Sequence, residues 1–461
     1  LSRGLGDVYK RQQGGIAMRK EIGILLAWVV FLSGCVGKPM EKQNEQTKKE
    51  DAVLRLYTLK ENENLWQSAK LFMEKYPKYP VVIEVGISEE DGKTVSDAIR
   101  SLNTEIMAGN GPDIILMDGL PIEDYIEKGV LEDLSDVVKG VKTNGEEFFE
   151  NVLSSYEKGE NLYAVPSRFS VPIIIGKEGA VTPDEVTGLS GTLKTRTEEQ
   201  IKGIARNATK SIPLLLLTFW NDIISEENMV DQEVLSTFLE EAKLLFDASD
   251  IDLELPYYQE VPPFQEMIEA YPNYSGDVGV TMAFQKDILS VDAMDMGQTL
   301  AQLESVSANS PVFYDYLNSE SGKKFIPKWI FGITASSEKK EAAKAFLSYF
   351  LSSENMDQYD WTLSVNKTSF RKTLPISETK EQMTVMYPEQ DSAEGIRIQK
   401  LNAEEAEEFV NFLSEADTKI AVEQALFEEI LTQAEHYVYG EESLESAVNA
   451  IVEKIEIYQA E

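Results

Sequence analysis

The chain has 461 residues but only one cysteine and one histidine. The single cysteine, Cys35, cannot form an internal disulfide, and one thiol without clustered histidines offers too few ligands for a structural metal site. The histidine, His436, lies in the helical stretch TQAEHYVYG. A Ser-His-Asp triad or a histidine-rich zinc centre would have to be built around that C-terminal helix. We therefore expect His436 to be structural, and we predict neither a metal nor another cofactor.

Basic residues are also scarce, since 43 Lys and Arg face 80 Asp and Glu, which gives a formal net charge of −37. Such an excess repels phosphate groups. It argues against nucleic-acid binding and against adhesion to anionic lipid headgroups through a basic surface. A solvated acidic surface that keeps the protein soluble explains the charge without any acidic site.

Sequence motifs of common enzymes are missing as well. No G-x-S-x-G, Walker A or GxGxxG stretch occurs. With so many carboxylates, some pair will always lie at a spacing suited to glycoside hydrolysis, but nothing singles out one pair. We predict that the protein is not an enzyme, and we keep a lipid-anchored glycan-processing enzyme as the alternative.

One apolar run follows a positively charged start and precedes Cys35. Residues 18–20 are Met-Arg-Lys, and the apolar core Ile22–Leu32 spans about 11 residues, which is shorter than the roughly 20 needed to cross a bilayer. This order is typical of a secretory signal peptide. Leu32-Ser33-Gly34-Cys35 resembles the lipobox of bacterial lipoproteins, in which the thiol receives a diacylglycerol. The alternative is a signal peptide or short anchor in which Cys35 is incidental.

Three N-terminal segments are therefore expected before the folded part. Residues 1–17 look like a translated adapter sequence and are predicted to be a non-native extension, and residues 18–34 are predicted to be a lipoprotein signal peptide. Residues 35–50 hold the lipidated Cys35 and a stretch rich in Lys, Glu, Gln and Asn, which is typical of a disordered tether.

Apolar periodicity downstream predicts strands that alternate with helices. The predicted order is strand 53–59, helix 65–76, strand 81–87, helix 94–107 and strand 113–117, which implies a parallel sheet. Further helices are predicted at 231–248 and 338–356, and two C-terminal helices are separated by Gly440 as a left-handed stop.

Two extended segments differ from these units. Residues 161–176 contain Pro166 and Pro172, so we expect no unbroken central strand there. Residues 324–337 are likewise expected to be extended. Both are predicted to cross between two lobes.

The order of these segments resembles the extracellular solute-binding proteins of ABC importers, in the carbohydrate-type family that includes maltose-binding protein. The resemblance is carried by the lipobox at Cys35, MAGNGPDIILMDG at 107–119, NLYAVPSRFSVPIII at 161–175, GDVGVTMAF at 276–284, GITASSEKKEAAKAFLSYFLSSENM at 332–356 and YGEESLESAVNAIVEKIEIYQAE at 439–461.

This resemblance implies an α/β, two-lobed periplasmic-binding-protein-like (type II) fold. Each lobe is expected to be a mostly parallel sheet flanked by helices, with a ligand cleft between the lobes. The expected boundaries are 51–167 plus 311–350 for lobe 1, and 168–310 plus 351–461 for lobe 2.

The resemblance also implies a function. The protein is expected to be a monomer, anchored by the lipid on Cys35 to the extracytoplasmic face of the bacterial membrane. It would capture a sugar or oligosaccharide and deliver it to the transmembrane subunits of an ABC permease. A binding protein for a peptide or another polar solute, or one that serves a sensor, is a further alternative.

A sugar site needs aromatic rings that pack against the C–H faces of the sugar, and side chains that hydrogen-bond its hydroxyls. Each candidate also has a structural reading: a solvated acidic loop for Glu61 and Asn62, a helix cap for Asp118, an ion pair between lobes for Arg168, and core packing for the aromatic residues. The segment 188–211 lacks the tryptophan that the sugar-binding pattern has there, so Trp220 is less securely aligned. The predicted ligand-binding residues are Glu61, Asn62, Asp118, Arg168, Trp220, Phe284 and Trp329.

Overall fold

A computed structural model describes ten stretches of the chain. They are residues 53–88, 92–183, 193–225, 229–270, 288–294, 312–318, 321–358, 363–379, 381–385 and 396–460. Cys35, Phe284 and the motif GDVGVTMAF at 276–284 lie outside the described residues. The fold below concerns the described residues alone.

The N-terminal strands and helices alternate as the periodicity predicts. β1 (Leu54–Thr58) pairs in parallel with β2 (Val81–Val85) and with β3 (Ile114–Leu116). α4 (Glu63–Lys75) and α5 (Val95–Met107) connect them, and the helix-starting caps are the side chains of Asn62 and Thr94. The predicted parallel sheet is confirmed for this part of the chain.

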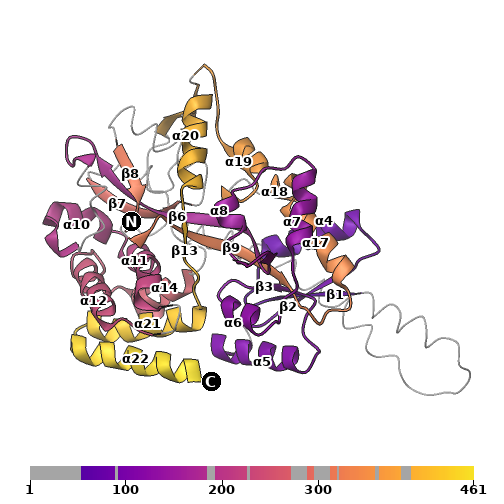
Figure 1. The fold of residues 1–461 in the computed structure, drawn as a ribbon. Coiled ribbons are helices and arrows are strands. Elements are labelled where there is room, and N and C mark those ends of the chain that lie inside the picture. Colours follow the sequence, from indigo (N-terminus) through magenta and orange to yellow (C-terminus); the bar gives the residue numbers. More distant parts are fainter. Residues whose placement is uncertain are drawn as a thin grey trace, which may run out of the picture. The chain divides into compact units, whose positions relative to one another are not determined.

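Two long strands run through the centre of the sheet (Figure 1), which has the order β10-β6-β9-β3-β1-β2. β6 (Val165–Lys177) pairs antiparallel with β9 (Lys324–Ile333), and β9 pairs antiparallel with β3. Beyond Ser170, β6 exchanges β9 for two new antiparallel partners, β7 (Leu289–Met294) and β8 (Val312–Tyr316).

The expectation that prolines prevent an unbroken strand at 161–176 is wrong, because β6 contains both of them. A proline lacks the N–H group but keeps its carbonyl. Pro172 lies where β6 changes partners, and its carbonyl accepts a hydrogen bond from Leu317 N at 2.9 Å. A strand that changes partners tolerates prolines that a uniform ladder would exclude.

The second half of the chain departs from the expected parallel sheet. β7 and β8 are antiparallel to β6, whereas β13 (Thr418–Lys419) is parallel to its partner, β9. α21 (Gln424–Val438) and α22 (Leu444–Ala460) lie side by side (Figure 1), next to α12 (Gln232–Asp247). Gly440 ends the first of them with φ of 77°, as predicted.

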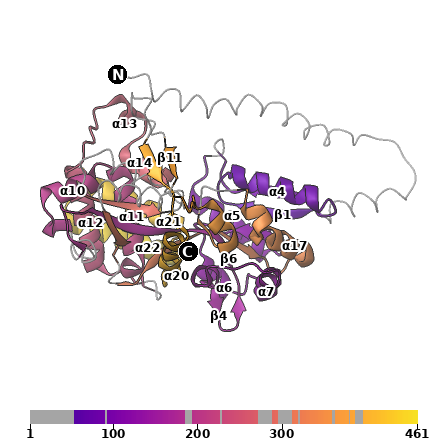
Figure 2. The same cartoon turned by 90° about the horizontal axis from the view of Figure 1, so that it is seen from above.

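The other described elements surround this sheet. α17 (Lys340–Leu351), although late in the sequence, lies beside α4 of the N-terminal part (Figure 2). No helix of the described residues is long and apolar enough to cross a membrane. The remaining bounds are α6 Ile122–Glu127, α7 Ser135–Thr143, α8 Glu150–Leu153, β4 Glu157–Lys158, β5 Asn161–Leu162, η2 Leu193–Thr195, α10 Glu198–Ala205, α11 Ala208–Ile223, α13 Pro256–Glu260, α14 Pro263–Ala270, α18 Ser353–Met356, β10 Leu363–Ser364, α19 Lys367–Thr373, β11 Gln382–Val385, β12 Ile396–Gln399 and α20 Ala403–Ser414.

β6 and β9 contribute to separate hydrophobic cores. Ile173 and Ile175 of β6 belong to the first core, with α4, α17 and α20, whereas Ile174 belongs to the second, with α11, α12 and α21. Alternate side chains of one strand point to opposite faces, so the same strand serves both cores. The buried residues of 356–416 join the first core. The predicted lobe boundaries, which assign 351–461 to lobe 2, stay a prediction.

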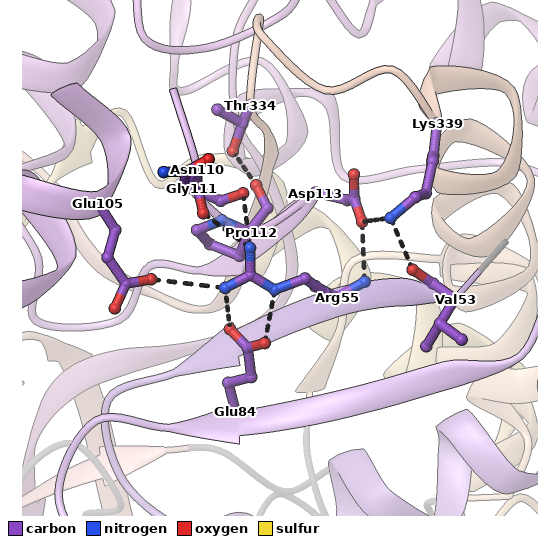
Figure 3. Close-up of polar contacts among 10 residues, drawn as sticks. All are labelled: Val53, Arg55, Glu84, Glu105, Asn110, Gly111, Pro112, Asp113, Thr334 and Lys339. Atoms are coloured by element: carbon purple, nitrogen blue, oxygen red, sulfur yellow. Dashed lines mark hydrogen bonds and ion pairs between the residues drawn. The ribbon is translucent and has the colours of Figure 1, made fainter. Parts of the chain in front are cut away.

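A polar network fixes one edge of the first core (Figure 3). Arg55 of β1 donates two hydrogen bonds to Glu84 of β2, at 2.6 and 2.9 Å. Asp113, directly before β3, accepts from Arg55 N at 2.8 Å and from Lys339 Nζ at 3.3 Å. Ser337 Oγ donates to the same carboxylate at 2.6 Å. The motif GNGPDI thus connects β1 to the turn that precedes α17.

Replacing Asp113 with alanine should lower the free energy of unfolding by about 3 kcal/mol. The change leaves the partly buried Lys339 ammonium and Arg55 backbone N–H without their shared acceptor, and uncompensated polar groups away from water are costly. Asp250→Ala is a matched control on an exposed aspartate, for which we expect a change within about 0.5 kcal/mol. Urea unfolding of both variants measures the difference. Equal stability of the two would show that the network contributes little.

Candidate functional site

A pocket opens where the loop after β3 meets the crossing strand β9. Its open volume, solvent-facing space included, is about 450 Å³. The loop after β3, the start of α6, β9 and the segment before α21 form its walls. Ligands commonly bind at the carboxyl ends of strands in α/β sheets, and β3 ends here. The lining residues are Asp118, Gly119, Leu120, Ile122, Glu123, Tyr156, Pro327, Ile330, Ile420, Ala421, Val422 and Glu423.

Asp118 holds the loop after β3 against the crossing strand. Its two carboxylate oxygens accept hydrogen bonds from Trp329 N at 2.7 Å and Ile330 N at 2.9 Å. Burial raises the pKa of Asp118 to about 6, although the two N–H groups favour the charged form. The alternative role predicted for Asp118 was a cap for the next helix. The residue before α6 is Pro121, and no side chain caps that helix, so Asp118 is bonded to the strand instead.

Trp329 and Arg168 lie next to this carboxylate. Trp329 has φ of 51°, an uncommon conformation for a residue with a side chain, and its ring centroid is 5.8 Å from that of Phe350. Arg168 is 1% exposed, and its guanidinium lies 6.0 Å from the Trp329 ring. Its Nη1 donates to Ser167 O at 3.2 Å and contacts the sulfur of Met356. Three of the predicted residues are therefore neighbours.

A lysine that the sequence analysis did not single out contacts two residues of the pocket wall, Glu123 and Tyr156. Lys419 Nζ lies 2.5 Å from Glu123 Oε1 and 2.9 Å from the carbonyl oxygen of Ser155. The same ammonium lies 3.8 Å from the ring centroid of Tyr156. This combination of a carboxylate, a carbonyl and an aromatic face orders Tyr156 at the wall of the pocket.

The start of α21 touches the loop after β3. Gln424 N donates to Gly119 O at 2.9 Å, and Gly119 has φ of 77°. A Cβ on Gly119 would lie 2.8 Å from Gln424 Cβ, so only glycine fits both the conformation and the contact. Gln424 Nε2 in turn donates to Glu428 at 2.7 Å, and Lys60, after β1, lies 3.9 Å from the same carboxylate. Burial lowers the pKa of Lys60.

The other predicted residues lie elsewhere. Glu61 is exposed, and Asn62 Oδ1 accepts a hydrogen bond from Leu65 N at 3.0 Å as the cap of α4. Trp220 is 4% exposed in the second core, with its ring 6.3 Å from that of Phe427. None of these three lines the pocket. Phe284 and Cys35 lie outside the described residues, so the roles predicted for them stay predictions.

The chemistry of the pocket suits a polar solute that donates hydrogen bonds. Asp118, Glu123 and Glu423 supply acceptors, Tyr156 supplies an aromatic surface, and Ile330 and Ile420 among others supply apolar contact. No group of His, Cys, Asp or Glu that could hold a metal ion occurs among the described residues. His436 lies in the last turn of α21, where its Nδ1 is 2.8 Å from Glu441 Oε2 and its pKa is raised by that hydrogen bond.

Comparison with known proteins finds a family model that matches part of the chain. Residues 58–206 match the model of bacterial extracellular solute-binding proteins. The proteins of that family bind solutes, as the sequence resemblance implied. No curated protein matches the chain at a significant level.

Solved structures of similar proteins include several sugar complexes. One is maltose-bound MalE3 of T. maritima, at 14% identity and a TM-score of 0.49, covering 88% of this chain and 99% of that one. A chitin oligosaccharide binding protein has 16% identity and a TM-score of 0.48, covering 89% and 99%. MalE of Bdellovibrio bacteriovorus bound to maltotriose has 12% identity and a TM-score of 0.48, covering 89% and 100%.

The raised pKa of Asp118 should appear in the pH dependence of stability. Between about pH 4 and pH 6 the folded protein keeps a proton that the unfolded chain loses, so Asp118 makes the protein less stable as pH rises through that window. The effect is at most about 3 kcal/mol, at roughly 1.4 kcal/mol for each pKa unit.

Urea unfolding of the unmodified protein and of Asp118→Asn from pH 4 to 7.5 isolates this effect, because other groups cancel in the difference. Asparagine has one accepting oxygen in place of two. This loss adds an offset to the difference in unfolding free energy that does not vary with pH. We expect the variant to gain stability relative to the unmodified protein as pH rises to about 6. A difference that does not vary with pH would contradict the assignment.

Proposed function

We propose that this chain is the substrate-binding lipoprotein of an ABC-type importer. It captures a sugar or oligosaccharide between two lobes and delivers it to the transmembrane subunits of a permease. The observation that carries this proposal is the pocket where the loop after β3 meets β9. Its walls come from the loop after β3, the start of α6, Tyr156, β9 and residues 420–423, and Asp118 bonds the loop to β9.

The two sides of the pocket also suggest how binding of a solute changes the conformation of the protein. A ligand that touches both the loop after β3 and the start of α21 stabilises the arrangement in which the two are close, through contacts that exist only there. The connections between the lobes are the continuous strands β6 and β9, which suit a hinge. A permease can then distinguish the loaded protein from the empty one by its conformation.

Sugar binding is tested by a thermal-shift screen against monosaccharides, oligosaccharides, peptides and polyamines. A solute that binds only the folded protein raises its melting temperature, by several degrees at a hundredfold excess over Kd. We expect sugars to give the shift and Asp118→Ala to lose it, whereas Asp250→Ala keeps it. A shift from peptides or polyamines alone would contradict a sugar ligand, and product release from labelled oligosaccharides would favour the enzyme alternative.

Membrane attachment is a separate part of the proposal. We propose that Cys35 receives a diacylglycerol, that cleavage after Gly34 makes it the new N-terminus, and that a monomer stays on the extracytoplasmic face. Cys35→Ser should abolish incorporation of labelled fatty acid and release the protein from the membrane fraction in a bacterial host. Sugar binding by the purified variant should be unchanged. Continued fatty-acid labelling of Cys35→Ser would contradict lipidation at this thiol.

A further inference from the structure

Residues 251–262, here called the α13 segment, present apolar side chains to solvent. The segment contains α13, which lies at the edge of the helices of the second half (Figure 2). Leu253, Leu255 and Tyr257 are 37%, 47% and 55% exposed. Single exposed apolar residues are common in soluble proteins, but several close together mark an interaction surface. None of the three lines the pocket of the proposed sugar site.

The α13 segment is held in place at both ends. Ile251 packs against the second core, and Phe264, just beyond the segment, is buried in the same core. Gln259 Nε2 donates to Leu253 O at 2.6 Å and so joins α13 to the turn before it. Pro256 occupies the first turn of α13, where its fixed φ suits a helix. A partner would therefore meet a backbone that is already ordered, which lowers the entropic cost of binding.

The charges of this part of the chain have one sign. No lysine or arginine occurs among residues 249–270. Burial and the charge of Glu266 raise the pKa of Tyr257 and of Tyr258. Burial also raises the pKa of Glu266, although the Tyr257 hydroxyl and Lys210 of α11 oppose the rise. The acidic residues of this stretch are Asp250, Asp252, Glu254, Glu260, Glu266 and Glu269.

Apolar side chains among carboxylates restrict the kind of partner that fits. These carboxylates would repel an anionic lipid surface and a second copy of the same segment. A purely apolar partner would remove the carboxylates from water without offering them a counter-charge. A protein segment that combines lysine or arginine with apolar side chains meets both requirements. Tyr257 suits such a contact, because its ring can be buried while its hydroxyl keeps a polar partner.

We infer that the α13 segment is a docking site for a protein segment that carries lysine or arginine next to apolar side chains. Leu255 and Tyr257 form the apolar centre of the contact. The exposed carboxylates of Glu254 and Glu260, which precede and follow them, face the cations of the partner. The docking site is separate from the pocket, so the inference does not depend on the proposed function.

A short amphipathic peptide of lysine and leucine tests the inference, with fluorescence anisotropy of the labelled peptide and the purified protein. We expect binding that weakens as salt is added. Leu255→Ser/Tyr257→Ser, the apolar variant, should bind roughly tenfold more weakly. Met107→Ser/Met229→Ser is its matched control, since both methionines are more exposed than Tyr257 and lie outside the α13 segment. Its Kd should stay within about twofold of the unmodified protein.

A second pair of variants tests the contribution of charge. Glu254→Gln/Glu260→Gln, the charge variant, should raise Kd about fivefold and reduce the dependence of binding on salt. Glu404→Gln/Glu408→Gln removes the same charge from exposed positions of α20 and should leave Kd within about twofold. All of these substitutions are at exposed positions, and melting temperatures confirm that each variant is folded.

Two further peptides separate the apolar and ionic requirements, one of lysine and serine and one of glutamate and leucine. Both should bind more weakly than the peptide of lysine and leucine. Equal binding by either, or an apolar or charge variant that binds like its control, would overturn the inference. Absence of any binding by the peptide of lysine and leucine would overturn it too. Each of these results would leave sugar capture in the pocket standing.

Discussion

The antiparallel pairing of β6 with β9 is the constraint on which the rest of the structure depends. Both strands are buried along their length, and each gives alternate side chains to different cores. β6 hydrogen-bonds to β9 up to Ser170 and to β7 and β8 beyond it, so the two halves of the chain share one continuous backbone ladder. Sliding one half of the chain past the other would break this ladder. Bending or twisting the strands of the ladder would not.

Asp118 couples the pocket to this ladder. The register between β6 and β9 is interrupted at Ser167 and Trp329, where Trp329 takes a positive φ. The N–H groups of Trp329 and Ile330 thereby become available to the carboxylate of Asp118. A strained residue and a partly desolvated carboxylate are both unfavourable alone, and such features persist where the surrounding structure over-determines them. Here each supports the other at the mouth of the proposed ligand site.

Sequence reasoning succeeded where a single local pattern decides the structure. The helices that start after Asn62 and Thr94, and the stop at Gly440, follow from caps and periodicity. It failed where long-range pairing decides. The prolines of β6 argued against a strand because its change of partners cannot be read from the chain, and the antiparallel second half was missed for the same reason. The wall formed by residues 420–423 has no composition that marks a site, since its role depends on the contact between Gln424 and Gly119.

The acidity of the chain and the carboxylates of the pocket have different consequences. The chain has a formal net charge of −37, and water and salt screen the charges of exposed side chains. In the pocket, burial raises the pKa of Asp118 and of Glu423, so each carboxylate is held at a cost unless a donor approaches it. A hydroxyl donates such a hydrogen bond without bringing a charge, whereas an anionic solute would add repulsion to the cost of burial. The same groups that make the empty pocket less stable therefore favour a solute that donates hydrogen bonds, such as one rich in hydroxyls, over an anion.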